Sequence, residues 1–155
     1  MEAKLFHRHK EGLRVILRRT DEANILFERA QSFLRSPVHS VGYADRTELT
    51  PDFFLAGESA LSEYSWLNPP SCETYAIYRR DCPIELQQEL VDEEQQVRVE
   101  LWRYDPHILG GDDCVDPLSL TLSLRENTDE RVEQAIEEML GDVWEGRYGS
   151  RNFEL

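Results

Sequence analysis

Apolar positions recur with helical spacing in three stretches of this chain, most clearly near its C-terminal end. Over residues 132–144 the apolar side chains follow a period close to 3.6, with Glu and Gln on the opposite face. Upstream, Asp116-Pro117 is a typical helix start, and Asn127, three residues before Glu130, resembles a capping box. The pattern predicts a helix of about two turns after Pro117 and a longer amphipathic helix after it.

Two earlier stretches have the same spacing. Thr20 is a suitable N-cap, an apolar stripe follows it, and Pro37 ends the pattern, which predicts a helix from about residue 20 to 35. Glu58 to Trp66 is predicted as a shorter helix that ends before Pro69.

Alternating or β-branched stretches lie between these helices. Val97 to Trp102 alternates apolar and polar residues, which predicts a half-buried strand with Val97, Val99 and Leu101 on the buried side. Thr74–Tyr78 and Val38–Tyr43 are also predicted strands, whereas Leu13–Arg19 fits a strand or the first turns of a helix.

The order of these elements predicts an α/β or α+β fold, with amphipathic helices packed on a small mixed β-sheet. Residues 1–155 are expected to form a single domain, with 1–19 as an N-terminal segment that can be mobile and 145–155 as a C-terminal tail. The apolar stripe of the last helix is expected to pack on a sheet that contains Val97–Leu101, because both surfaces need an apolar partner.

Charge is distributed unevenly along the chain. Residues 1–50 contain nine Lys or Arg and seven Asp or Glu, whereas residues 51–155 contain eight and 24, and the whole chain has a net charge of −14. This acidity favours a basic partner and opposes duplex DNA binding by the chain alone. Because the sequence has no long apolar run and no leader-like start, we expect a cytoplasmic protein without a membrane segment.

The sequence contains no complete catalytic or metal-binding motif. Its two lysines, Lys4 and Lys10, do not fall in a phosphate-binding loop, and no G-x-S-x-G sequence occurs. Cys72, Cys82 and Cys114 are far apart and lack the spacing of a zinc site. We therefore expect reduced cysteines, no metal and no cofactor.

One constellation resembles the opening of the nucleotidyltransferase fold. In that fold a small-residue turn holds a phosphate, and the next strand carries two metal-binding acids one residue apart. Here the turn is Gly57-Glu58-Ser59, the first acid is Glu73, and Glu100 on a later strand is the third carboxylate. Tyr75 stands where the second acid belongs, so the resemblance implies a degenerate or weak Mg²⁺-nucleotide site.

A second resemblance covers residues 57–140. Ser59-Ala60-Leu61, Trp66-Leu67, Pro69-Pro70 and the Thr74–Tyr78 strand resemble the effector-domain segment of type IV abortive-infection antitoxins and related transcriptional regulators. The later stretch from VRVELWRYDP to VDPLSLTLSLRENTDERVEQAIEEML is similar to proteins that accompany such systems. Residues 1–50 are too short and too poor in helix-turn-helix pattern to form the complete winged-helix DNA-binding part of that family. The resemblance therefore implies a partner-binding domain beside a nucleotidyltransferase-type toxin.

Two functional hypotheses follow. The first is a non-enzymatic, antitoxin-like or regulatory protein that binds a protein partner, with no catalytic residue. The second is a nucleotidyltransferase-like enzyme, active or degenerate, that uses Glu73 and Glu100. The candidate binding residues are those of the turn and three aromatic residues that can anchor a contact: Gly57, Glu58, Ser59, Trp66, Trp102 and Tyr104.

Overall fold

The computed structural model describes residues 6–19, 22–111 and 113–146, which fall into two compact units divided between Arg35 and Ser36. The first unit contains a two-stranded antiparallel hairpin of β1 (Phe6–Glu11) and β2 (Arg14–Arg19). Gly12 has a φ of 61° in the two-residue turn between them, a conformation that glycine adopts without strain. The Leu13–Arg19 segment is therefore a strand from Arg14 on, and its partner β1 has no counterpart among the strands predicted from the sequence.

The predicted helix at residues 20–35 is present but shorter. It runs as α1 (Ala23–Ala30) and continues in a 3-10 turn, η1 (Gln31–Phe33). Glu22 occupies the N-cap position without a side-chain capping bond. The predicted cap, Thr20, lies outside the described residues.

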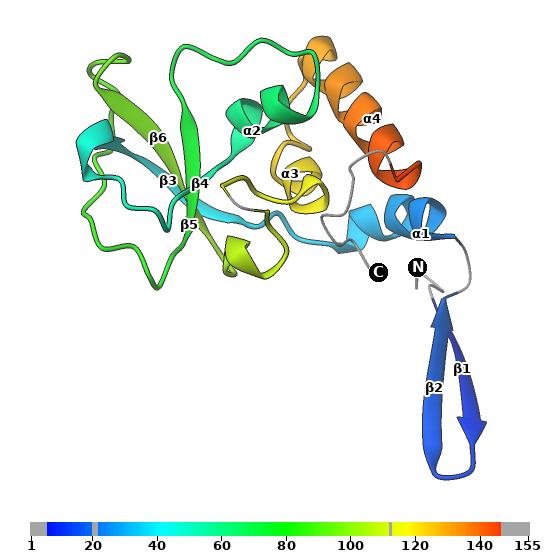
Figure 1. Ribbon diagram of the computed structural model, residues 1–155. Helices are drawn as coiled ribbons and strands as arrows, with labels where there is room; N and C mark the ends of the chain where they lie inside the picture. The colour runs from blue at the N-terminus through cyan, green and yellow to red at the C-terminus, as the bar shows by residue number, and fades with distance from the viewer. Residues whose placement is uncertain (1–5, 20–21, 112, 147–155) are drawn as a thin grey trace. The chain divides into compact units, whose positions relative to one another are not determined.

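The second unit is built on a four-stranded mixed sheet. Its strands are β3 (Val38–Asp45), β4 (Phe54–Leu55), β5 (Thr74–Tyr78) and β6 (Gln96–Trp102), in the order β3-β6-β5-β4 (Figure 1). β5 and β6 are parallel, and the two outer pairs are antiparallel. The predicted α/β class with a small mixed sheet is confirmed.

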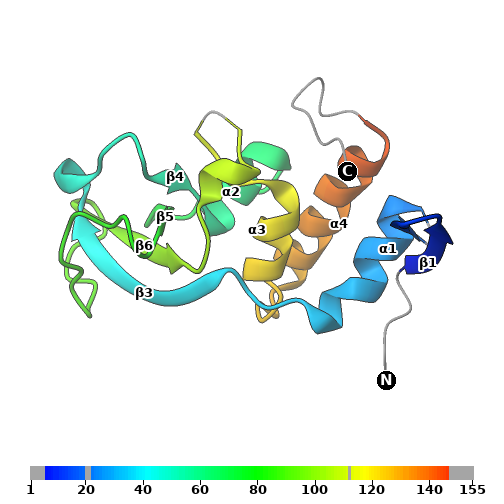
Figure 2. The same ribbon diagram turned by 90° about the horizontal axis from the view of Figure 1, so that it is seen from below.

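Three helices lie on one side of this sheet: α2 (Gly57–Tyr64), α3 (Pro117–Ser123) and α4 (Glu130–Trp144) (Figures 1 and 2). Their buried residues form one core cluster with Ala76 of β5 and Trp102 of β6. From α4 the cluster includes Val132, Ala135 and Met139, which confirms the apolar stripe predicted for this helix.

The opposite face of the sheet has its own core. Val97 and Val99 of β6 cluster there with Ile77, and the 79–95 connection covers them with partly buried side chains such as Leu86. α4 therefore belongs to a core on the sheet that contains Val97–Leu101, as predicted, but this core is on the opposite face from Val97 and Val99. Residues of a strand alternate between faces, and the α4 cluster receives Trp102 from the other side of β6.

The prediction that β6 is buried on only one face is also wrong. Glu100 is 2% exposed and Trp102 is 0% exposed, although both were assigned to the polar side of the strand. β6 is an inner strand with a core on each face, so its two sets of side chains are both covered.

The N-cap predicted for α3 is confirmed, whereas the N-cap of α4 is a different residue from the predicted one. The carboxylate of Asp116 accepts the backbone N–H of Ser119, which confirms it as the cap of α3. For α4 the cap is Asp129, which accepts the N–H of Arg131, rather than the predicted Asn127. The side-chain oxygen of Asn127 instead accepts the N–H of Asp129, one step before the helix.

Candidate functional site

The Gly57-Glu58-Ser59 turn is fastened to the neighbouring strand rather than open to a ligand. Gly57 has a φ of 56°, and a Cβ placed on it would lie 3.1 Å from the Cβ of Thr74. The hydroxyl of Ser59, which is 2% exposed, accepts the backbone N–H of Thr74 at 3.0 Å. Glycine and serine are therefore required here because α2 approaches the start of β5 so closely.

Glu58 serves a second structural connection. Its Oε1 accepts a hydrogen bond from the side-chain amide of Asn127 at 3.1 Å, which joins the start of α2 to the loop between α3 and α4. All three turn residues thus lie close to other parts of the fold, and the side chains of Glu58 and Ser59 are already hydrogen-bonded within it.

Glu73 takes part in a surface network next to β5. Its Oε2 accepts hydrogen bonds from the Arg46 guanidinium at 2.9 Å and from the Tyr75 hydroxyl at 2.7 Å. Burial, followed by the hydrogen bond to Glu73, raises the pKa of Tyr75 to about 12. The tyrosine that replaces an expected acid is therefore a neutral donor to Glu73.

Glu100 is buried on the other face of the sheet. It pairs with Ala76 across β5 and β6, so it projects to the same side as Ala76, whereas Glu73 shares the side of Tyr75. Burial raises the pKa of Glu100, although the guanidinium of Arg98 at 3.3 Å opposes that change. The structure therefore does not bring Glu73 and Glu100 together.

The three aromatic candidates differ in what they expose. Trp102 is fully buried, and its ring meets that of Tyr104 edge-on at a centroid distance of 5.7 Å. The Tyr104 hydroxyl donates to Ser119 Oγ at 2.6 Å, so this residue also serves the fold. Trp66 is 56% exposed and has surface to offer a partner.

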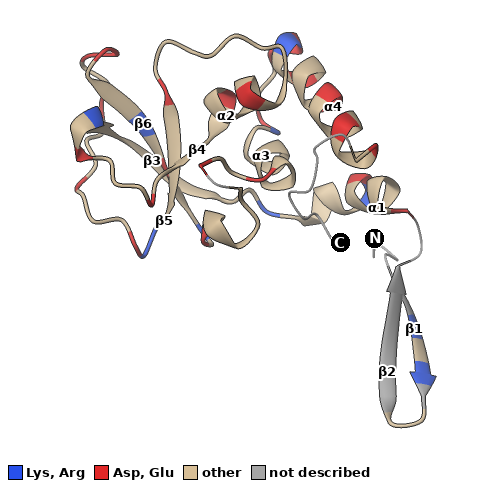
Figure 3. Cartoon of the chain, in the orientation of Figure 1, with Lys and Arg blue, Asp and Glu red and all other residues tan. Residues whose placement is uncertain are grey.

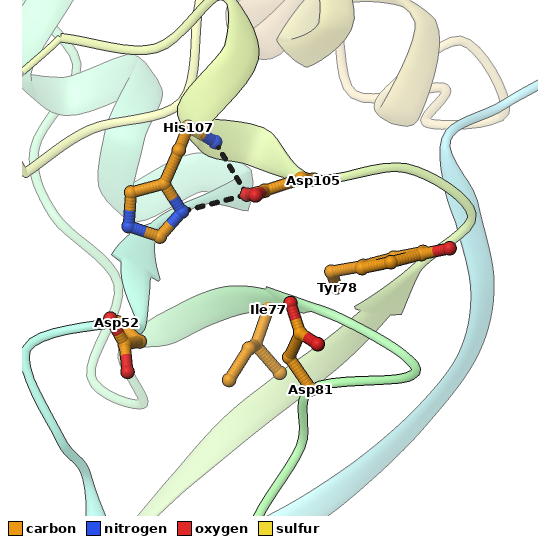
Figure 4. Close-up of a pocket in the computed structure, with 6 residues that line it drawn as sticks. All are labelled: Asp52, Ile77, Tyr78, Asp81, Asp105 and His107. Atoms are coloured by element: carbon orange, nitrogen blue, oxygen red, sulfur yellow. Dashed lines mark hydrogen bonds and ion pairs between the residues drawn. The ribbon is translucent and has the colours of Figure 1, made fainter.

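A pocket that sequence analysis did not predict lies at the end of β5. It has a volume of about 280 Å³ and is lined by residues of β5, of the turns beside it and of η3 (Pro106–Ile108), namely Asp52, Ile77, Tyr78, Asp81, Asp105 and His107 (Figure 4). In Figure 4, Ile77 lies between Asp52 and Asp81, and His107 and Asp105 lie above them. Three of its six lining residues are acidic.

A local motif holds the upper wall of the pocket in place. Asp105 Oδ1 accepts the backbone N–H of His107 at 2.9 Å and contacts its Nδ1 at 2.7 Å. The imidazole also lies against the Phe54 ring, with centroids 4.2 Å apart. These hydrogen bonds, the backbone one foremost, keep the pKa of Asp105 below its usual range. The Asp-Pro-His sequence is the signal that could have identified this wall, because Asp caps a turn with Pro at its first position.

The pocket presents negative charge on a partly apolar surface. Among the described residues, no cluster of three or more His, Cys, Asp or Glu side chains is arranged to hold a metal ion. Asp105 is committed to His107, and the lining contains no Ser, Thr, Cys or Lys that it could activate. This geometry suits the binding of a cationic group better than nucleophilic catalysis.

Within the described part of the chain, no helix combines the length and apolar character needed to span a bilayer. Comparison of the chain with protein families, with curated proteins and with solved structures finds no match.

Proposed function

We propose that this chain is a non-enzymatic interaction protein that binds a basic protein partner through the acidic surface of its second unit. The observation that carries this proposal is the concentration of exposed carboxylates on that unit. On α4 alone, Glu133, Glu137 and Glu138 are exposed on the face opposite the core, and Figure 3 shows further acids on α2 and the loops. Such a surface accelerates the encounter with a positively charged partner and excludes negatively charged ones.

The nucleotidyltransferase alternative has less support. It requires Glu73 and Glu100 to share a metal ion, and these residues lie on opposite faces of the sheet. It also requires the 57–59 turn to receive a phosphate, yet Ser59 is buried and bonded to Thr74. The partner implied by the sequence resemblance, a nucleotidyltransferase-type toxin, would then supply any catalysis.

The test begins with affinity capture of partners from the native host at low salt, followed by calorimetry with the purified partner. We expect the dissociation constant to rise by about tenfold between 50 and 300 mM salt, because screening weakens attraction between exposed charges. The triple variant Glu133→Gln, Glu137→Gln, Glu138→Gln should bind more weakly and lose part of this salt dependence.

A parallel assay tests the enzymatic alternative. Purified protein is incubated with Mg²⁺ or Mn²⁺ and each nucleoside triphosphate, with and without tRNA, and nucleotide transfer is followed. Metal-dependent transfer that is abolished by Glu73→Gln or Glu100→Gln would overturn the proposal. A partner that binds equally well at all salt concentrations would also contradict it.

A further inference from the structure

The pocket at the end of β5 has features that the overall acidity of the chain does not explain. Its buried floor residue, Ile77, is 2% exposed, and Tyr78, the next residue of β5, also lines the pocket. Carboxylates of Asp52 and Asp81 stand on either side of this floor (Figure 4). The pocket therefore combines an apolar base with negatively charged sides.

The two flanking carboxylates have no counter-ion in the described part of the chain. Asp52 and Asp81 form no side-chain hydrogen bond or ion pair there, and Arg79 and Arg80, which precede Asp81, do not pair with it. Asp105 keeps its negative charge, because its hydrogen bonds to His107 lower its pKa. A cation that enters the pocket thus gains two free carboxylates without displacing an existing ion pair.

We infer that this pocket receives an arginine side chain of the protein partner, an inference that rests on the proposed function. A guanidinium is flat and has donors on several edges, so it can bond to carboxylates on two sides at once. Its methylene stem packs on an apolar surface such as Ile77, and its plane stacks on an aromatic ring such as Tyr78. The volume of about 280 Å³ lies just below the range typical of small-molecule sites, which suits one inserted side chain.

The chain next to the pocket indicates what flanks that arginine. Ile108 and Leu109 directly follow His107 and are 71% and 54% exposed. Large apolar side chains at such exposure beside a concave site are typical of a contact surface. The partner segment that fits is an arginine with an apolar neighbour.

Titration with a minimal probe tests this inference in the intact protein. N-acetyl-arginine amide is added to ¹⁵N-labelled protein, with N-acetyl-citrulline amide as the uncharged probe of the same shape. Arginine amide should shift the amide resonances of Ile77, Tyr78 and His107 and saturate in the millimolar range, about 1 to 10 mM, as expected for a single side chain. Equal shifts with citrulline amide would overturn the inference, since charge would then have no part in binding.

Paired variants locate the site. Asp52→Asn with Asp81→Asn should weaken arginine-amide binding by about tenfold, the effect of losing two charge-assisted contacts. Glu137→Gln with Glu138→Gln removes the same charge from α4 and should leave this affinity within about twofold. Equal weakening by both pairs would show that the probe responds only to net charge, which contradicts a specific pocket.

The same variants separate this inference from the proposed function. Partner binding that is retained in full by the Asp52→Asn, Asp81→Asn protein would refute the pocket as the docking point while leaving the interaction function intact. If the wild-type protein has no basic partner, the proposed function fails. The arginine-amide titration still decides whether the pocket binds a guanidinium.

Discussion

The indole N–H of Trp102 donates to the carboxylate of Glu100 at 3.2 Å, in the core beneath the helices. The two residues lie two positions apart on β6 and therefore project to the same face. Glu100 is 2% exposed, so its carboxylate is removed from water, and among the described residues it accepts hydrogen bonds from the Trp102 indole and the Arg98 guanidinium. A buried acid of this kind makes stability depend on pH.

Glu100→Gln tests that dependence. Burial raises the pKa of Glu100, so the folded chain holds this proton more tightly than the unfolded chain does. Its contribution to stability is therefore largest at low pH and falls as pH rises through the raised pKa. At neutral pH the unfolding free energy of the variant should be at most about 1 kcal/mol below that of wild type, or above it. The reason is that the amide oxygen of Gln also accepts the Trp102 N–H.

The measurement is urea unfolding of both proteins from about pH 4 to about pH 8. The difference in unfolding free energy should move in favour of the variant as pH rises. A difference that stays constant across this range would contradict a raised pKa. Glu137→Gln, on the exposed face of α4, is the control for the loss of one carboxylate.

Two glycine substitutions should have opposite effects. Gly57→Ala should destabilise the fold by about 1 to 3 kcal/mol, because alanine is strained at a φ of 56° and its Cβ would crowd Thr74. Gly141→Ala should stabilise it by about 0.5 to 1 kcal/mol, because the site lies in α4 and the added Cβ would meet open space beyond the helix's own backbone. Chemical denaturation of the two variants in parallel is the measurement. Equal effects would show that packing at Gly57 is looser than described.

Ser59→Ala distinguishes a structural role from a ligand-binding one. The substitution leaves the buried N–H of Thr74 without its acceptor and should cost about 1 to 3 kcal/mol. Ser71→Ala, at an exposed position, should change stability by less than about 0.5 kcal/mol. Thermal melts compare the two variants. Unchanged stability in Ser59→Ala would contradict the structural role of Ser59 and favour a ligand-binding role for the turn.

Met139→Ala tests the packing of α4. Met139 is 0% exposed within the cluster that joins the three helices to the sheet. Its truncation should cost about 2 to 5 kcal/mol through lost burial and the cavity it leaves. Glu138→Ala, one position away on the exposed face, should stay within about 0.5 kcal/mol of wild type in the same urea titration.

Several elements could be predicted from the chemistry of adjacent residues alone. The Thr74–Tyr78 strand has the predicted bounds, and the Asp116-Pro117 start of α3 is present as expected. Both depend on properties of adjacent residues, namely β-branched and aromatic side chains in the strand and a capping carboxylate before proline in the helix. The apolar stripe of α4 could also be predicted from the sequence, because a period of 3.6 residues is a property of one segment.

The partners of those elements depend on the whole fold. The alternation of β6 predicted one covered face, but its position inside the sheet covers both, so Trp102 and Glu100 are buried. The same alternation places Val97 and Val99 away from α4. A pattern along one strand cannot reveal what lies on its second face.

The sequence alone determined the fold class, most of the elements and the acidity of the residues that follow the first 50, because propensity, periodicity and charge are local or additive properties. Only the tertiary structure decided which of the candidate site residues lie together. It separated Glu73 from Glu100 across the sheet, and it gathered Asp52, Asp81 and the Asp105–His107 pair from three separate turns into one pocket. Residues distant in sequence meet only through strand order and register, which no local pattern encodes.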